Sequence, residues 1–388
     1  MVLERIKIRS LRCYDQADIE VDPKFNAIVG LNGQGKTSLL EAIGLLAFFR
    51  SFRAAKNQEI LRLESEEGRV SGTVFHEDLR YELSVKVWPH RKQASFNGKN
   101  CKLLSNYVGK LSAVSFSPVD LEIIRGAPEN RRNWVDRIAQ IYFSEHVDLT
   151  SEYQKVLRHR NRLLKEAIEN RGRLNDDFEL WTDQLCDLGA KIIANRVDAA
   201  NQITPSIRAH YETLSKKKTH IIIKYLGADF GKEQSGQNSP AQGTFWITEQ
   251  VREMLKAGLR KTLQRDMILG TTSMGPHRDD LELRMSGSPV KAFGSQGEVR
   301  SLVLAMRLAE VEKQKETKGY SPLLLIDDFS SELDANRRKF LLDYLIDSGS
   351  QVFLTTTEET RLGKVFAVKE GRISSHDNGF SKDRHQQL

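Results

Sequence analysis

Along the N-terminal part of the chain, apolar and polar residues alternate in several short runs, which is the pattern of half-buried strands. The run over 25–29 is mostly apolar and leads into a glycine-rich stretch, and the residues from 38 to 49 are mostly apolar and helix-forming. A strand, a glycine-rich turn and a helix are therefore predicted in that order. Further strands are predicted over 3–8, 19–21, 68–76, 81–88 and 93–97.

The middle of the chain changes to a helical period. Apolar residues recur at spacings of three and four from 128 to 170, from 177 to 214 and from 247 to 267, so we expect long helices there. The stretch 231–243, rich in Gly, Gln and Ser, is predicted to be a flexible loop. The last part alternates again, with helices predicted within 294–316 and over 336–346, strands over 323–326 and 351–355, and a loose polar end from about 377.

Composition narrows the class of protein. The 388 residues are enough for two domains, and 39% of them are hydrophobic, as in a soluble globular protein. No apolar run is long enough to span a bilayer, and the N-terminus does not resemble a signal peptide, so we expect no membrane association and a cytoplasmic location. The three cysteines are far apart, which argues against a disulfide framework or a zinc site. The net charge of +7 favours an acidic partner only weakly, because the excess is spread over both parts of the chain.

The glycine-rich turn fits the pattern G-x-x-x-x-G-K-T. In such a loop, backbone N–H groups and the following helix N-terminus bind phosphate oxygens, the lysine reaches the β- and γ-phosphates of ATP, and the threonine hydroxyl binds Mg²⁺. A chance glycine-rich turn is the alternative, and the strand–turn–helix setting disfavours it. The predicted nucleotide-binding residues are Gly30, Leu31, Asn32, Gly33, Gln34, Gly35, Lys36, Thr37 and Ser38.

A second motif consists of four large apolar residues followed by Asp327 and Asp328. A strand of this kind is buried in a parallel sheet and presents the carboxylates at its C-terminal end, where ligands of α/β proteins bind. Asp327 is predicted to bind Mg²⁺ with Thr37, and Asp328 to act in catalysis with Lys36 by orienting or deprotonating the attacking water. The alternative is a buried strand that simply ends in an acidic turn.

The distance between these motifs predicts the domain organisation. Lys36 and Asp327 are 291 positions apart (327 − 36), far more than a compact P-loop domain needs. We therefore expect an α/β fold, a P-loop ATPase head of the ABC/SMC type built from both chain ends, 1–120 and 270–388. A mainly helical domain, 121–269, would be inserted between them.

Three weaker motifs fit such a head. Ser295, Gln296 and Gly297 open a helix and resemble the ABC signature motif, in which a serine and backbone N–H groups contact a phosphate, although a plain capping box is the alternative. Residues 331–334 resemble the D-loop, or cap a helix. Residues 355–357 are all threonine where ABC ATPases usually carry a switch histidine, so a threonine hydroxyl would have to serve.

Further blocks of sequence make the chain similar to one known family. Residues 11–14 resemble the N-terminal Phe-Arg-Asn-Tyr of the RecF family, with Leu11 and Cys13 as departures. Residues 117–121 and 126–132 resemble its mid-chain block, 275–281 its G-P-H-R-D-D motif and 293–300 its signature block. These blocks stand in the right order over nearly the whole chain, which is thereby identified as a member of the RecF family of bacterial recombination mediators, related to SMC-type heads.

The resemblance implies a function. Members are ATP-dependent homodimers in which each ATP lies between the P-loop of one subunit and the signature segment of the other, and slow hydrolysis resets the dimer as a weak, DNA-stimulated switch. They bind gapped DNA and junctions of single and double strands, and they load RecA with RecO and RecR during repair and the SOS response. An SMC-type structural ATPase without junction preference is the alternative, although the heptads of a long coiled coil are missing.

The resemblance also assigns further residues. Arg12 is expected to contact the nucleotide, with capping of a strand as the alternative. His277 and Arg278 would sense ATP or hold two lobes together. The basic runs 158–162 and 216–218, together with Arg50 and Arg53, are candidates for binding DNA phosphates. The alternative is that these charge runs are solvated helix faces, which is more common.

Overall fold

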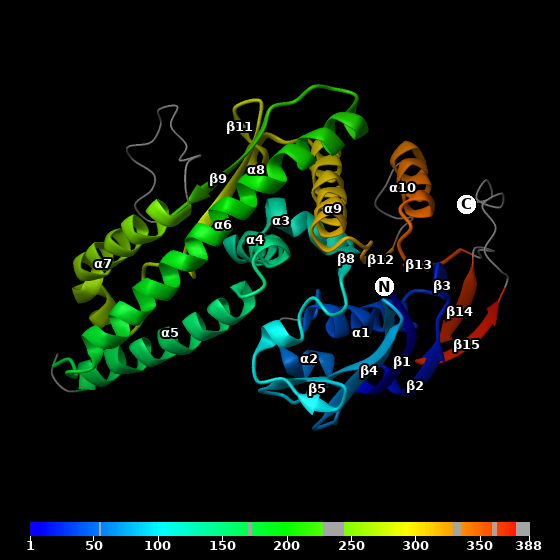
Figure 1. Cartoon of the computed structure of the whole chain (residues 1–388), viewed down its shortest axis with the longest axis horizontal. Helices are drawn as coiled ribbons and strands as arrows, with labels where there is room; N and C mark the ends of the chain where they lie inside the picture. The colour runs from blue at the N-terminus through cyan, green and yellow to red at the C-terminus, as the bar shows by residue number, and fades with distance from the viewer. Residues whose placement is uncertain (54–55, 170–172, 228–243, 329–334, 359–362, 378–388) are drawn as a thin grey trace. The chain divides into compact units, whose positions relative to one another are not determined.

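The computed structural model describes residues 1–53, 56–169, 173–227, 244–328, 335–358 and 363–377. Contacts divide the chain into two compact units (Figure 1), the first made of Met1–Leu121 with Val303–Leu388 and the second of Glu122–Leu302. The second unit extends beyond the predicted insertion 121–269, because β10 (Asp280–Met285) pairs with β9 (Ile221–Leu226) of the same unit.

One sheet of the first unit is antiparallel, with the order β2-β1-β4-β5-β6-β7. In β1 the buried residues Leu3 and Ile6 are three positions apart, although side chains of a regular strand alternate. A register shift against β4 between Leu3 and Arg5 explains this, because a bulge turns both side chains to the same face. The strands are β1 (Val2–Leu11), β2 (Tyr14–Glu20), β4 (Gly68–His76), β5 (Leu79–Val87), β6 (Lys92–Phe96) and β7 (Lys99–Asn100).

The other sheet of this unit has the order β15-β14-β3-β13-β12-β8 and is parallel except for β15. Its strand β12 lies between β8 and β13, and all four of its residues are buried, as the apolar run over 323–326 predicts. The strands are β3 (Phe25–Val29), β8 (Ala113–Phe116), β12 (Leu323–Ile326), β13 (Val352–Thr356), β14 (Lys364–Lys369) and β15 (Arg372–Asp377). We did not predict β8, β14 or β15.

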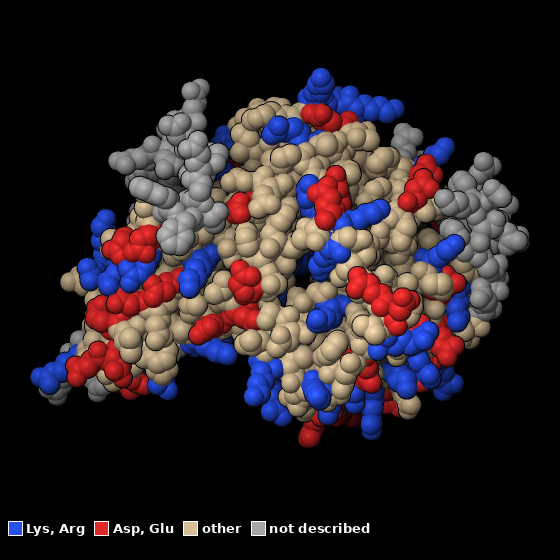
Figure 2. Space-filling view, in the orientation of Figure 1, with Lys and Arg blue, Asp and Glu red and all other residues tan. Residues whose placement is uncertain are grey.

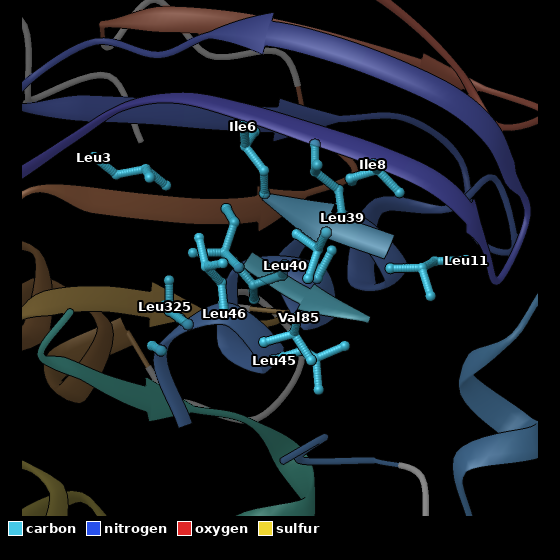
Figure 3. Close-up of a cluster of buried hydrophobic side chains, with 14 of the residues drawn as sticks. Leu3, Ile6, Ile8, Leu11, Leu39, Leu40, Leu45, Leu46, Val85 and Leu325 are labelled. Carbon is cyan, nitrogen blue, oxygen red and sulfur yellow. The ribbon is translucent and has the colours of Figure 1, made fainter. Parts of the chain in front are cut away.

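Helix α1 (Lys36–Phe48) joins the two sheets into one core. In Figure 3, Leu39, Leu40 and Leu46 of this helix lie in one cluster with Ile6 of β1 and Leu325 of β12. Leucines on several sides of the helix are buried, so α1 is an internal helix rather than an amphipathic surface helix. Its position is thereby fixed by packing on both sheets, which matters because the P-loop immediately precedes it.

The first unit has further helices, one of which belongs to it only in part. They are α2 (Asn57–Ile60), the 3₁₀ helices η1 (Leu104–Asn106) and η2 (Pro118–Leu121), α10 (Ala335–Asp347) and α9 (Gln296–Lys318), whose first residues group with the second unit. Over the described part of the chain, none of the helices has the length and apolar character to cross a membrane.

The second unit is mainly helical, with a three-stranded sheet of the order β11-β10-β9. Residues 128–170, predicted to be helical, form two helices, α4 (Pro128–Tyr142) and α5 (His146–Glu169), because the helix is interrupted at 143–145. Tyr153, Leu185, Ile193 and Leu255 are among the buried residues that hold α5, α6 and α7 together. The remaining elements are α3 (Glu122–Arg125), α6 (Phe178–Ser215), α7 (Thr244–Leu269), α8 (Val290–Phe293) and β11 (Ser288–Pro289).

The G-P-H-R-D-D block lies in the second unit, and its histidine is enclosed there. His277 Nε2 is 3.1 Å from the carbonyl oxygen of Thr272, which only accepts, so Nε2 carries the proton. Nδ1 then accepts a hydrogen bond of 2.7 Å from the Tyr153 hydroxyl. These contacts select the neutral imidazole, and burial, reinforced by nearby arginines, lowers the pKa of His277 to about 4.

This histidine should make stability depend on pH. Between pH 6.5 and about 4 the unfolded chain binds the proton and the folded chain does not, so stability falls as the pH decreases, by up to about 3 kcal/mol. We expect His277→Gln, whose amide can keep both contacts, to lose less stability over this window in urea unfolding at pH 7 and pH 4. Exposed His90 is the control position, and equal losses in the His277 variant and the unsubstituted protein would contradict the assignment.

Candidate functional site

The P-loop connects β3 to α1, and its backbone leaves no room for side chains at two glycines. Gly35 has φ 112°, and a Cβ there would lie 2.6 Å from Cys13 Sγ. At Gly30 a Cβ would lie 2.4 Å from the carbonyl oxygen of Val368. Glycine is therefore required at both positions, the first for its conformation and the second for close approach to β14.

Lys36 begins α1 and is 9% exposed. Its Nζ donates hydrogen bonds to the carbonyl oxygens of Gly30 (2.7 Å) and Leu31 (3.0 Å), so the ammonium lies under its own loop. Burial lowers the pKa of Lys36, while the nearby carboxylates of Asp328 and Asp327 act in the opposite direction. Lys36 is thus held near the carboxylate pair. An anion in the cavity can replace the two carbonyl oxygens as its hydrogen-bond acceptors.

Asp327 follows β12 and accepts hydrogen bonds from two hydroxyls. Thr37 Oγ1 donates to Asp327 Oδ1 at 2.8 Å, and Thr355 Oγ1, at the end of β13, donates to the same oxygen at 2.9 Å. The backbone N–H of Asp328 donates to Thr355 Oγ1 at 2.8 Å. Burial raises the pKa of Asp327, and the two hydroxyls oppose this shift. Thr355 therefore links both members of the carboxylate pair.

These residues share one cavity of about 820 Å³ in the first unit. Of the predicted site residues, it is lined by Arg12, Asn32, Gly33, Gly35, Lys36, Thr37, Ser38, Asp327 and Asp328. Gly30 and Leu31 contribute carbonyl oxygens to Lys36, whereas the Gln34 side chain accepts from the backbone N–H of Glu370 at 2.8 Å. Gln34 therefore ties the loop to the β14–β15 turn.

The oxygen atoms of this cavity suit a magnesium ion. Mg²⁺ takes hard oxygen ligands and commonly uses one or two protein groups together with phosphates and water. Thr37 Oγ1 and Asp327 Oδ1, 2.8 Å apart, supply such a pair. The described residues contain no group of three or more His, Cys, Asp or Glu that could hold a metal.

Arg12 lines the same cavity and forms an ion pair that the sequence did not reveal. Its guanidinium donates to both carboxylate oxygens of Glu41, at 2.8 and 3.0 Å. Glu41 is the only charged residue in α1 after Lys36, and a single carboxylate within an apolar helix is the signal that would have indicated it. Arg53, beyond α1, also lines the cavity, and its charge opposes the rise that burial causes in the pKa of Asp327.

The predicted signature segment forms the capping box that was its alternative interpretation. Glu298 Oε2 accepts from the backbone N–H of Ser295 (2.9 Å) and from its hydroxyl (2.8 Å), while Ser295 Oγ accepts from the Glu298 N–H. Ser295 and Gln296 are exposed at the start of α9, and Gly297 is half-buried. The capping box thus uses the backbone N–H groups of Ser295 and Glu298, while the Ser295 and Gln296 side chains remain at the surface.

The other sequence candidates have different outcomes. Arg160 is buried and donates to Asp266 and Thr272, so its assignment to DNA phosphates was wrong, because its charge is satisfied inside the second unit. Arg158, Arg162 and the lysines 216–218 are exposed, and Arg50 is exposed after α1. Figure 2 shows Lys and Arg interleaved with Asp and Glu over the visible face. The D-loop prediction, 331–334, and the loop 231–243 lie outside the described residues.

Comparison with known proteins places the chain in a family. The family model described as RecF/RecN/SMC N terminal domain matches residues 2–382. The DNA replication and repair protein RecF of Myxococcus xanthus is 35% identical over 360 residues, which cover 92% of this chain and 91% of that protein. The protein of the same name from Geobacter sulfurreducens is 34% identical over 362 residues, 93% of this chain and 94% of that one.

Solved structures agree with these sequence matches. The recombination mediator protein RecF with ATPrS, of the RecFOR pathway, superposes with a TM-score of 0.82 at 31% identity, over 96% of this chain and 97% of that one. An Smc head bound to the C-winged helix domain of ScpA, 15% identical, has a TM-score of 0.52 over 97% and 98% of the two chains and shows a shared fold. The predicted fold class and family resemblance are thereby confirmed: the chain has the fold of an ABC/SMC-type ATPase head and belongs to the RecF family.

Proposed function

We propose that this chain is an ATP-controlled switch that binds DNA in recombinational repair. The observation that carries the proposal is that Thr37, Asp327 and Thr355 meet in one cavity with the P-loop lysine, although Thr37 and Asp327 are 290 positions apart. P-loop ATPases hold a nucleotide and its metal with this set of groups. A solved relative described as RecF–ATP in the RecFOR pathway supports ATP as the nucleotide.

The chemistry follows from the positions of these groups. The backbone N–H groups of the P-loop and the N-terminus of α1 would bind the phosphates of ATP, and Lys36 would turn from the loop carbonyls to the phosphate oxygens. Thr37 and Asp327 would hold Mg²⁺, which supplies positive charge to the transferring phosphoryl group. Asp328 would orient or deprotonate the attacking water.

A second copy of the chain is proposed to complete the site. Ser295 and Gln296 are exposed where α9 begins, and helix N-termini favour phosphate groups. They would contact the ATP of the partner subunit together with Gly297, so that ATP binding closes a homodimer. Hydrolysis would then open it, slowly and with stimulation by DNA, as a switch.

DNA is the proposed ligand of the closed dimer. Relatives are named DNA replication and repair proteins, and the exposed lysines 216–218 and the net charge of +7 suit a phosphate backbone. We propose that the preferred DNA is a gapped duplex or a junction of single and double strands. RecR and RecO would be the partners with which this chain loads RecA. The setting would be the cytoplasm and the SOS response.

Binding to gapped, duplex and single-stranded DNA, each with ATP and with ADP, tests this proposal. We expect ATP to raise affinity for the gapped duplex above that for the other two, and to shift the mass measured by light scattering from monomer to dimer. Equal affinity for all three DNAs would favour an SMC-type structural ATPase. Affinities and masses that do not respond to ATP would overturn the switch.

Thr355 should matter more for hydrolysis than for binding. Thr355→Val keeps the shape but removes the hydroxyl that holds Asp327 and the Asp328 backbone. We expect the hydrolysis rate to fall about tenfold, because the lost hydrogen bonds correspond to roughly 1–2 kcal/mol, while ATP affinity changes less. Single-turnover hydrolysis and ATP titration separate the two effects. Thr355→Ser is the matched control, and equal rates in the Val variant and the unsubstituted protein would exclude this role.

A further inference from the structure

Helix α1 carries a buried carboxylate, Glu41, that does not line the nucleotide cavity. It is 0% exposed and lies in a helix whose neighbouring residues Leu39, Leu40, Ala42 and Ile43 belong to the apolar core. An ionised carboxylate loses its hydration when it is buried, and this is tolerated only when charged or hydrogen-bonding partners replace the water. The partners of Glu41 therefore indicate why it is there.

Glu41 accepts hydrogen bonds from two separate segments of the chain. Oε2 accepts from Arg12 Nε at 2.8 Å, and Oε1 accepts from Arg12 Nη2 at 3.0 Å, which makes a bidentate pair. The Ser51 hydroxyl also donates to Oε1. The pair uses Nε and one hydrogen of Nη2, so the remaining N–H groups of Arg12, two on Nη1 and one on Nη2, are the donors that can meet a phosphate oxygen.

Each of these segments brings an arginine to the cavity. Arg12 is at the β1–β2 turn, where its φ of 53° places it in the left-handed region, and its guanidinium lies along the cavity wall. Ser51 Oγ accepts a hydrogen bond of 2.9 Å from the backbone N–H of Arg53, and Arg53 also lines the cavity. One carboxylate thus holds Arg12 directly and the Arg53 backbone through a hydroxyl.

We propose that Glu41 is a positioning residue that orients two arginines, Arg12 and Arg53, toward the phosphates of the bound nucleotide. The inference rests on the proposed ATP site and adds to it a residue that acts without touching the ligand. The Arg12 side chain is 25% exposed and would be able to turn toward solvent, but the pair with Glu41 prevents this. The pair also reduces the conformational freedom that Arg12 would lose when the nucleotide binds.

A purely structural ion pair is the competing explanation, and energetics favour positioning. A buried ion pair stabilises a fold little compared with apolar residues of the same volume, and α1 is otherwise apolar after Lys36. An apolar side chain at this position would therefore serve the core at least as well. Only the carboxylate also holds the Arg12 guanidinium and, through Ser51, the backbone of Arg53.

Double-mutant cycles test the proposal, with the dissociation constant of a fluorescent ATP analogue as the readout. In the unsubstituted background, Glu41→Gln is expected to weaken binding about tenfold, the scale of one charge-assisted hydrogen bond. In an Arg12→Ala background the same change should weaken it less than about twofold, because the oriented group is gone. Weakening by the same factor in both backgrounds would mean that Glu41 does not act through Arg12, and that result would overturn the proposal.

A second cycle avoids any folding defect of the buried Gln variant. Ser51→Ala removes only the link to the Arg53 segment, and we expect it to weaken binding roughly threefold, an effect that disappears in an Arg53→Ala background. Asp18→Asn, which breaks an exposed bidentate pair with Arg5 outside the cavity, should leave affinity unchanged. If the unsubstituted protein does not bind the analogue, the proposed function falls as well. If it binds and both cycles show no coupling, only the positioning role falls.

Discussion

Lys36→Ala is expected to lower the affinity for ATP at least about hundredfold and to abolish the ATP-dependent dimer. The ammonium is already confined beneath the loop by two carbonyl oxygens and lies near two carboxylates, so it can neutralise phosphate charge without a large rearrangement. Two charge-assisted hydrogen bonds to phosphate correspond to about 3 kcal/mol, which is roughly a hundredfold in the dissociation constant.

Titration with a fluorescent ATP analogue and light scattering with and without ATP measure these effects. Lys7→Ala is the matched control, because Lys7 is exposed in the same unit and pairs only weakly with Asp18, at 3.7 Å. Circular dichroism of the Lys36 variant should match that of the unsubstituted protein. A Lys36→Ala protein that still dimerises normally with ATP would mean that the nucleotide binds elsewhere.

Arg307→Met is expected to have the largest effect on stability, about 3–5 kcal/mol in the free energy of unfolding. Arg307 is 1% exposed and donates to Asp120 Oδ1 at 2.6 Å and to Glu310 Oε1 at 2.5 Å. Methionine fills much of the space but removes the cation that the two buried carboxylates share. The loss of this ion pairing, rather than lost packing, causes the predicted instability.

Urea unfolding separates this cause from packing. Adding Asp120→Asn and Glu310→Gln to Arg307→Met should recover part of the loss, because the two charges disappear. Arg5→Met is the control, since the Arg5–Asp18 pair has a similar 2.6 Å distance but lies in solvent, so its loss should change stability little. A loss below 1 kcal/mol for Arg307→Met would show that water reaches the carboxylates.

Local patterns predicted the parts of the site that carry their own signal. The P-loop and the apolar run before Asp327 each have a distinctive sequence, and the long interval between them predicted a head assembled from both chain ends. The network around Thr355 could not be predicted, because its partners, Asp327 and Asp328, follow the separate strand β12 and meet Thr355 only through the order of the strands. Three threonines in a row indicated a hydroxyl but not which acceptor it would meet.

The missed elements share a physical reason. Strand β8 has only four residues, and Ser115 interrupts its apolar residues, so its sequence shows neither alternation nor the continuous apolar run that indicated β12. Strands β14 and β15 form a hairpin whose first strand pairs with β3, far away in the sequence. The division at 303 was also hidden, because α9 continues through it as one regular helix while the tertiary contacts change along its length.

The strand order of the parallel sheet has a consequence for synthesis on the ribosome. The strand that leads into the P-loop, β3, has β13 and β14 as its two neighbours, and both follow it by more than 300 positions in the sequence. A nascent chain therefore carries its phosphate loop on an unpaired strand until residues 352–369 have been synthesised. A product that terminates before residue 327 would lack both neighbours and Asp327, so it would be unable to turn over nucleotide.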